Sequence, residues 1–205
     1  MPPRLAELIA RYPALAVCEA DLLRAYEALV AMFRSGNKLL LCGNGGSASD
    51  CDHIAGEMLK GFGRKRPLPV ADRARLGESL AAQLQGSLPT LSLPSFSGLF
   101  TAWANDCEPE YVYAQLVHGL GKPGDVLLAI STSGNARNVA HAVEVARASG
   151  ITVIGLTGAT GGTLAQRAHL AIRVPATETF KIQEYHLPVY HALCLAVEEA
   201  MFPLS

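Results

Sequence analysis

One short stretch, residues 38–57, constrains the fold of this chain more than any other. It opens with the apolar run Leu39–Cys42, which has the length and composition of a buried β-strand. A glycine-rich turn, Gly43–Gly46, and Ser47 follow, and the next residues can continue as a helix. Turn glycines tolerate positive φ, and free N–H groups at a helix start attract anions, phosphate above all. The stretch therefore predicts a strand–turn–helix unit that binds an anion.

Two polar residues lie one turn into the predicted helix. His53 and Glu57 are spaced i, i+4, which places an imidazole and a carboxylate side by side on one face. Such a pair serves as half of a metal site, as an acid/base pair or as a surface pair. Taken alone, the pair favours the surface interpretation.

Composition excludes several classes of protein. The chain has 205 residues, half of them hydrophobic, with a formal net charge of −1, so nothing indicates nucleic acid as the main partner. Five cysteines without a Cys-x-x-Cys pair do not form a disulfide framework, which favours a reducing cytoplasm. We expect neither a signal peptide nor a membrane-spanning segment. The high apolar share favours burial between subunits.

Apolar spacing predicts a single α/β domain. Residues 3–34 read as two helices broken near Pro13, which either pack on another subunit or cover the chain's own sheet. The alternation of strands and helices in the rest of the chain predicts a parallel sheet with helices on both faces. The expected strands after the first are 91–93, 126–130, 151–156 and 170–174, and the expected helices are 47–60, 72–85, 96–104, 108–120, 136–149, a short one ending near 167, and 180–201.

Residues 61–90 are rich in glycine and proline and give the least regular pattern. Within them Arg64, Lys65 and Arg66 form a basic cluster. We interpret this cluster as a solvated charge run in preference to a phosphate contact.

A second polar loop follows a predicted strand. Ser131, Thr132 and Ser133 offer three hydroxyls at a helix start, whereas capping that helix needs only one. Ligands bind outside the carboxyl ends of parallel strands, so this loop and residues 43–47 should face one crevice. The spacing matches neither a P-loop nor a dinucleotide fingerprint. Phosphate binding is the prediction.

The predicted last helix carries polar residues in an apolar context. Gln183 and His191 are eight residues apart and project within about a quarter turn of each other. Such residues need partners, and a site built with His53 and Glu57 would supply them. Asn105-Asp106, at the end of another helix, serves either as a turn or as a ligand for sugar hydroxyls.

Taken together, these motifs resemble the sugar isomerase (SIS) domain family and, within it, the sedoheptulose 7-phosphate isomerases, or phosphoheptose isomerases. The resemblance covers the chain except about residues 64–90. It rests on Cys-Gly-Asn-Gly-Gly-Ser at 42–47, His53 with Glu57, Asn105-Asp106, Gly-Asp-Val-Leu-Leu-Ala-Ile-Ser-Thr-Ser-Gly-Asn at 124–135, Leu-Thr-Gly at 156–158, and Ile-Gln-Glu-Tyr-His at 182–186 with His191.

The resemblance implies a three-layer flavodoxin-like sandwich with a parallel sheet. It implies one SIS domain over 1–205, with an N-terminal helical arm at 1–36 and a variable insertion at 61–90. It also implies a homotetramer with active sites at subunit interfaces. The residues expected to hold the sugar phosphate are Asn44, Gly45, Gly46, Ser47, Glu57, Asn105, Asp106, Ser131, Thr132, Ser133 and Gln183. Those expected to bind one Zn²⁺ per subunit, with modest affinity, or to move protons are His53, Glu57, Gln183 and His191.

Two departures from the family pattern stand out. The family often has a serine three residues after the Ser-Thr-Ser run, where this chain has Ala136. The segment after Lys60 is also longer than usual.

The expected activity is conversion of sedoheptulose 7-phosphate to D-glycero-D-manno-heptose 7-phosphate through an enediolate, the first step of nucleotide-activated heptose biosynthesis. Glu57 is the candidate carbon base, and His191 is the candidate acid/base on the oxygens. The alternatives are a sugar-phosphate sensor and a non-catalytic SIS protein that assists assembly at replication initiation. The set of His53, Glu57, Gln183 and His191 favours the enzyme, since such an assembly factor does not retain it in full.

Overall fold

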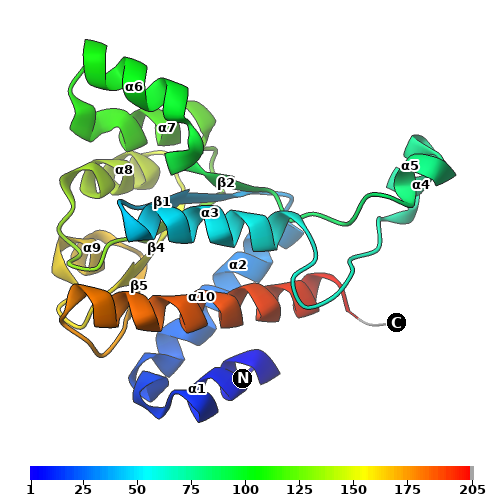
Figure 1. Ribbon diagram of the computed structural model, residues 1–205, viewed down its shortest axis with the longest axis horizontal. Helices are drawn as coiled ribbons and strands as arrows, with labels where there is room; N and C mark the ends of the chain where they lie inside the picture. Colours follow the sequence, from blue (N-terminus) through cyan, green and yellow to red (C-terminus); the bar gives the residue numbers. More distant parts are fainter. Residues whose placement is uncertain (204–205) are drawn as a thin grey trace.

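The computed structural model describes residues 1–203 and shows a three-layer α/β sandwich (Figure 1). Its central sheet has five parallel strands in the order β2-β1-β3-β4-β5. The strands are β1 (Leu39–Cys42), β2 (Thr90–Ser92), β3 (Val126–Ile130), β4 (Thr152–Thr157) and β5 (Leu170–Arg173). The predicted parallel sheet is therefore confirmed, with strand ends within one residue of those expected.

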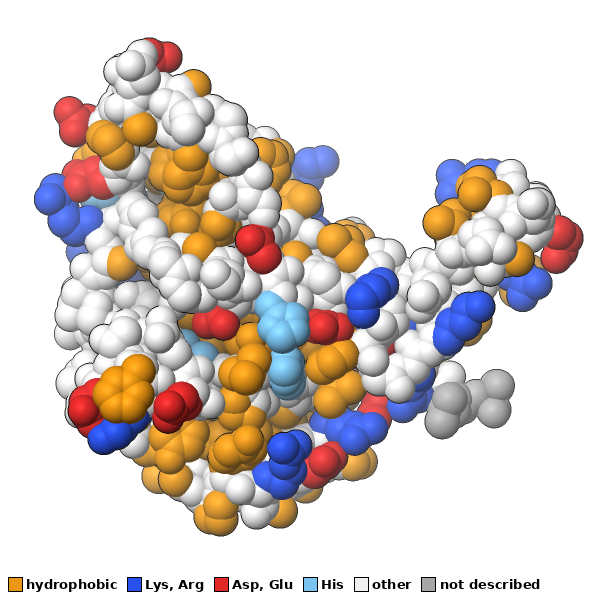
Figure 2. All heavy atoms as spheres, in the orientation of Figure 1, with side chains coloured by type: hydrophobic (Ala, Val, Ile, Leu, Met, Phe, Trp, Pro, Cys, Tyr) orange, Lys and Arg blue, Asp and Glu red, His pale blue; other side chains and the backbone are white. Residues whose placement is uncertain are grey.

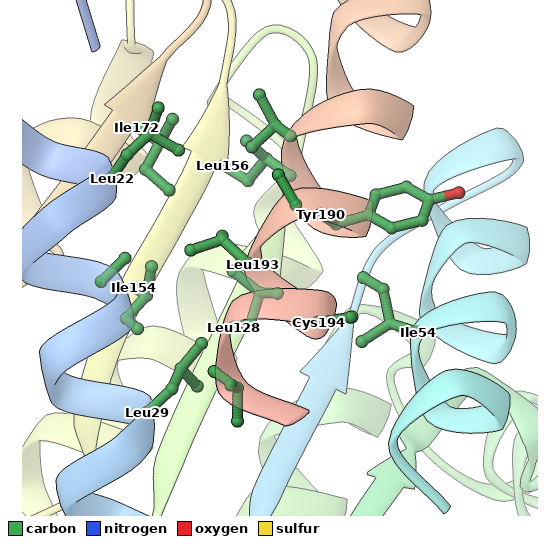
Figure 3. Close-up of a cluster of buried hydrophobic side chains, with 14 of the residues drawn as sticks. Leu22, Leu29, Ile54, Leu128, Ile154, Leu156, Ile172, Tyr190, Leu193 and Cys194 are labelled. Carbon is green, nitrogen blue, oxygen red and sulfur yellow. The ribbon is translucent and has the colours of Figure 1, made fainter. Parts of the chain in front are cut away.

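One face of the sheet is covered by α2 (Glu19–Arg34), α3 (Gly46–Leu59) and α10 (Thr179–Met201), and α1 (Pro3–Arg11) packs on α10 and α2. A 3₁₀ helix, Pro13–Cys18, joins α1 to α2. Figure 3 shows Leu22 and Leu29 of α2 facing Ile154 and Ile172 of the sheet. The cover-helix interpretation is confirmed for α2, which packs on the sheet, whereas α1 lies outside it on α10 and α2. Packing of these helices on another subunit stays a prediction.

The other face carries α7 (Val112–Leu120), α8 (Arg137–Ala148) and α9 (Gly162–Arg167), with α6 (Ser97–Asp106) outside α7. Side chains of β1 alternate between the two layers: Leu39 and Leu41 pack under α2 and α10, while Leu40 and Cys42 pack under α7 and α8. A strand covered on both sides must be apolar at every position, which explains the uninterrupted run in the sequence.

Residues 67–85 form an arm that projects from the body, at the right of Figure 1. It holds two short helices, α4 (Val70–Leu76) and α5 (Glu78–Ala81), where the sequence predicted one. Gly77, at φ 78°, separates them. None of the α4 side chains is buried, and Val70 is 84% exposed. The base of the arm is closed by hydrogen bonds from Gly86 N–H to the Arg66 carbonyl and from Leu88 N–H to the Met58 carbonyl.

The interpretation of residues 64–66 as a solvated charge run is wrong for Arg66, which is fully buried. Its Nε donates to Glu198 Oε1 at 2.8 Å, and Glu198 is buried as well. Arg66 also donates to the carbonyls of Glu57 and Met58 at the end of α3. These carbonyls have no partner within the helix, so a buried guanidinium is a suitable donor for them.

No helix within residues 1–203 is both long and apolar enough to cross a membrane.

Candidate active site

Three loops meet at the carboxyl edge of the sheet: 43–46 after β1, 131–136 after β3 and 158–161 after β4. Backbone hydrogen bonds join the loop after β3 to β4 and to the loop that follows β4: Ser131 N–H donates to the Leu156 carbonyl, and Gly158 N–H donates to the Thr132 carbonyl. The first loop is attached through Asn44, whose side-chain amide exchanges two 2.8 Å hydrogen bonds with that of Asn138 in α8. The two predicted phosphate loops therefore do lie at one edge.

The loop 131–135 presents its hydroxyls in different ways. Ser131 is buried, Thr132 is half-buried and Ser133 is exposed. Ser133 Oγ accepts a hydrogen bond from Asn135 N–H at 3.2 Å, which fixes a local turn. In the described chain no side chain caps the start of α8 at Ala136, so the hydroxyls are not used as helix caps.

The predicted pair on α3 meets the predicted histidine of α10. His53 Nε2 lies 3.3 Å from Glu57 Oε1 and 3.5 Å from His191 Nε2. Because His53 is 42% exposed at the side chain while Glu57 is 13% exposed, the imidazole lies at the opening and the carboxylate beneath it. In Figure 2, histidine side chains gather near the middle of this face, with acidic side chains on both sides and apolar surface below.

Glu57 has one oxygen without a hydrogen-bond partner. Its Oε2 is buried and unpartnered among residues 1–203, and the nearest cation, Lys60 Nζ, is 3.7 Å away on a largely exposed side chain. A buried carboxylate oxygen normally has a donor or a cation. The site therefore has unused capacity to bind a positive charge.

Gln183 lies against the glycine turn. A Cβ placed on Gly46 would be 2.5 Å from Gln183 Nε2, so only glycine at this position leaves the amide where it is. The first turn of α3 and the first turns of α10 thus meet at the edge of the sheet, next to the loops.

Burial and charge lower the affinity of His191 for a proton. Desolvation is the larger cause and the neighbouring His53 the second, and together they lower the pKa of His191 despite the opposing carboxylate of Glu57. A neutral imidazole is the form that accepts a proton or binds a metal.

Asn105 and Asp106 are not brought to this cluster within one chain. They end α6, are exposed, and pair with each other through Asn105 Nδ2 and Asp106 Oδ1 at 2.7 Å. Among residues 1–203, no hydrogen bond or ion pair joins them to His53, Glu57 or His191.

The structure adds two residues that the sequence did not indicate, Tyr190 and Asp50. Tyr190 reaches from α10 toward α3 (Figure 3), and its hydroxyl lies 3.0 Å from His53 Nδ1 and 3.2 Å from Asp50 Oδ1. Burial raises the pKa of Tyr190 and that of Asp50. Asp50 is three residues before His53, so its helical spacing was a usable signal; Tyr190 had none beyond its place next to His191.

Comparison with known proteins places this arrangement in a family. A model of the SIS domain matches residues 104–196. Phosphoheptose isomerase of Alteromonas mediterranea is 42% identical over 182 residues, covering 87% of this chain and 82% of that protein. Phosphoheptose isomerase of Rhodospirillum rubrum is 41% identical over 184 residues, covering 90% and 88% of the two chains.

Solved structures of phosphoheptose isomerases are also similar to this chain over most of its length. Phosphoheptose isomerase GmhA from Neisseria gonorrhoeae matches with a TM-score of 0.76 and 32% identity over 95% of this chain and 94% of that one. A phosphoheptose isomerase from Francisella tularensis matches with a TM-score of 0.78 and 28% identity, covering 93% and 91%.

Proposed function

We infer the chemistry of this site from the premise that the chain belongs to the phosphoheptose isomerase family of SIS-domain proteins. It is an isomerase, and its substrate is sedoheptulose 7-phosphate, converted to D-glycero-D-manno-heptose 7-phosphate. The observation that supports this most directly is the convergence of His53, Glu57 and His191 beside two hydroxyl- and glycine-rich loops. A sensor or an assembly factor has no need of a carboxylate with an unpartnered buried oxygen.

Aldose–ketose isomerisation moves one proton between C1 and C2 and one between the two oxygens. Glu57 Oε2, which has no hydrogen-bond partner, is the group that takes the proton from C1 and returns it to C2. His191, kept neutral by its surroundings, exchanges a proton with O1 and O2 of the enediolate. Ser131, Thr132, Ser133 and the turn 44–47 hold the phosphate and fix the distance from it to the reacting carbons.

A divalent cation fits the donors present. Ligands of a tetrahedral zinc with bonds of about 2.0–2.2 Å lie roughly 3.3–3.6 Å apart, and the two separations from His53 Nε2 are 3.3 and 3.5 Å. Within residues 1–203 no group of three or more His, Cys, Asp and Glu side chains is arranged to hold a metal ion as the side chains stand. We propose that His53, Glu57 and His191, together with the amide of Gln183, would hold the cation when it binds. Zinc held there would act as a Lewis acid on the substrate oxygens, and the amide ligand predicts modest affinity.

The exposed pair Asn105-Asp106 supports a site shared between subunits. Neither residue reaches the cluster of its own chain, and both present polar groups suited to sugar hydroxyls. We expect a homotetramer in which they serve a neighbouring site. Two further expectations stay predictions: a single SIS domain over 1–205, of which the last two residues lie outside the described part, and a cytoplasmic location. Four buried free thiols and one exposed free thiol support a reducing compartment.

The direct test is incubation with sedoheptulose 7-phosphate in D₂O followed by NMR. Deuterium at C2 of a new aldose phosphate is the expected result, although complete internal transfer would leave the product unlabelled. If neither product nor exchange forms with zinc present, the proposed chemistry is wrong.

Glu57→Gln separates catalysis from binding. The amide keeps the shape but cannot accept a carbon-bound proton, so turnover should be lost while the sugar phosphate still binds in calorimetry. Glu144→Gln, which changes a surface carboxylate on α8, is the control and should leave both unchanged. Full turnover in Glu57→Gln would assign the carbon base to another group.

A further inference from the structure

The ring of His53 has a partner at each nitrogen. Nδ1 lies 3.0 Å from the Tyr190 hydroxyl, and Nε2 faces Glu57 Oε1 and His191 Nε2. A neutral imidazole carries one proton, so one of these two sides must receive the bare nitrogen. The position of the proton determines whether Nε2 has a free lone pair with which to bind a cation or accept a hydrogen bond in the site.

Counting protons at Tyr190 makes that choice. The hydroxyl has one hydrogen. His53 Nδ1 is the nearer acceptor at 3.0 Å, but the negative charge of Asp50 makes its Oδ1, at 3.2 Å, the stronger one, and a carboxylate can only accept. Tyr190 then has only lone pairs to offer to His53. We propose that Asp50 and Tyr190 are positioning residues that hold the proton of His53 on Nδ1 and so leave Nε2 as a bare lone pair directed at Glu57 and His191.

Packing makes this a fixed arrangement. Tyr190 is only 2% exposed, and Figure 3 shows its ring beside Ile54 of α3 and Cys194 of α10. The His53 and Tyr190 rings meet edge to face with centroids 5.6 Å apart. Asp50 precedes His53 by three residues on the same helix, so the acceptor and the imidazole move together.

The consequence concerns the cation, and this part rests on the proposed function. With Nε2 bare, a nitrogen lone pair faces a carboxylate oxygen at 3.3 Å with no proton between them. Both atoms can then donate an electron pair to one cation placed between them. Loss of a hydrogen bond that orients a metal-binding histidine typically lowers metal affinity about 10–100-fold.

The tautomer is measurable without metal or substrate. Metal-free protein with ¹⁵N-labelled histidine, held above the titration of its histidines, gives two-bond ¹H–¹⁵N correlations that distinguish Nδ1–H from Nε2–H, and His53→Asn identifies the His53 signals. We expect Nδ1–H in the wild type. Asp50→Ala should free the tyrosine hydrogen to turn toward His53 and convert the ring to Nε2–H. Asp50→Asn retains an acceptor oxygen and should restore Nδ1–H.

Zinc titration supplies the second readout. Tyr190→Phe and Asp50→Ala should each weaken zinc binding by about 10–100-fold, while Tyr26→Phe, which removes a hydroxyl from the same core at α2, should not. A wild-type ring with its proton on Nε2, or an Asp50→Ala ring still protonated on Nδ1, would overturn the proposal. Wild-type protein that fails to bind zinc yet shows the Nδ1–H form would instead refute the metal and leave the positioning intact.

Discussion

Removing the carboxylate of Glu198 should cost this protein a large part of its stability. Glu198 is fully buried and accepts three hydrogen bonds: from Arg66 Nε at 2.8 Å, Phe62 N–H at 2.8 Å and Gly63 N–H at 2.7 Å. Glu198→Ala leaves a buried guanidinium without its counterion and two N–H groups without an acceptor. Breaking one side of a buried ion pair costs about 3–5 kcal/mol.

The adjacent residue provides a matched control. Glu199 also contacts two arginines, Arg4 and Arg64, but on side chains that are 21–37% exposed. Solvent screens such pairs, so Glu199→Ala should cost at most about 1–2 kcal/mol.

Urea unfolding at one fixed protein concentration measures both variants, because the stability of the proposed homotetramer would depend on concentration. For a domain of this size each kcal/mol shifts the melting temperature by about 2–4 °C, so Glu198→Ala should melt about 6–20 °C lower. Equal unfolding midpoints for the two variants would refute the idea that the buried pair fastens the end of α3 to α10.

Three further changes test the site and the fold. Gly46→Ala should displace Gln183 and lower kcat by about 100-fold with the fold intact. As a control, the new methyl group of Gly56→Ala on the same helix contacts nothing, so this variant should raise the free energy of unfolding by about 0.5–1 kcal/mol. Equal kcat in the two variants would contradict this placement of the Gln183 amide. Ala136→Ser supplies the missing side-chain cap of α8, so it should raise the free energy of unfolding by about 1 kcal/mol and tighten phosphate binding. Neither effect is expected if the new hydroxyl points to solvent. Burial lowers the pKa of His186 from 6.5 to about 4, so unfolding, which restores its ordinary affinity for a proton, becomes easier in acid. The free energy of unfolding should fall by about 2 kcal/mol between about pH 7.5 and pH 5, and an unchanged slope in His186→Asn would assign the effect elsewhere.

The spacing of apolar residues and the glycine turns predicted the strands and helices that depend on neighbouring residues. The run Leu39–Cys42 was recognisable as a buried strand because both of its faces are covered, and the helix after Gly46 followed from the turn. The meeting of His53 and Glu57 with His191 was inferred from the need of polar groups for partners, and the structure brings the three together.

Arg66 shows where such inference fails. A basic triplet in a glycine- and proline-rich segment has the composition of a surface loop, and its partner, Glu198, is 132 residues away in the chain. The only local sign was the carboxylate pair Glu198-Glu199 in an otherwise apolar stretch near the end of α10. Likewise, nothing in the spacing linked Tyr190 to His53, since the contact depends on how α3 and α10 cross.

The closed base of the arm has a consequence for how this protein can diverge. Residues 67–85 leave and re-enter the body at one point, where Gly86 N–H bonds to the Arg66 carbonyl. The entropy of closing a loop grows only slowly with its length, by about 0.6 kcal/mol for each doubling. Homologous chains can therefore lengthen, shorten or change the sequence of this arm at little energetic cost, while Arg66 holds the backbone at Glu57, the proposed carbon base, in place. The arm is the part of the molecule in which new recognition can evolve, or be grafted, independently of the chemistry.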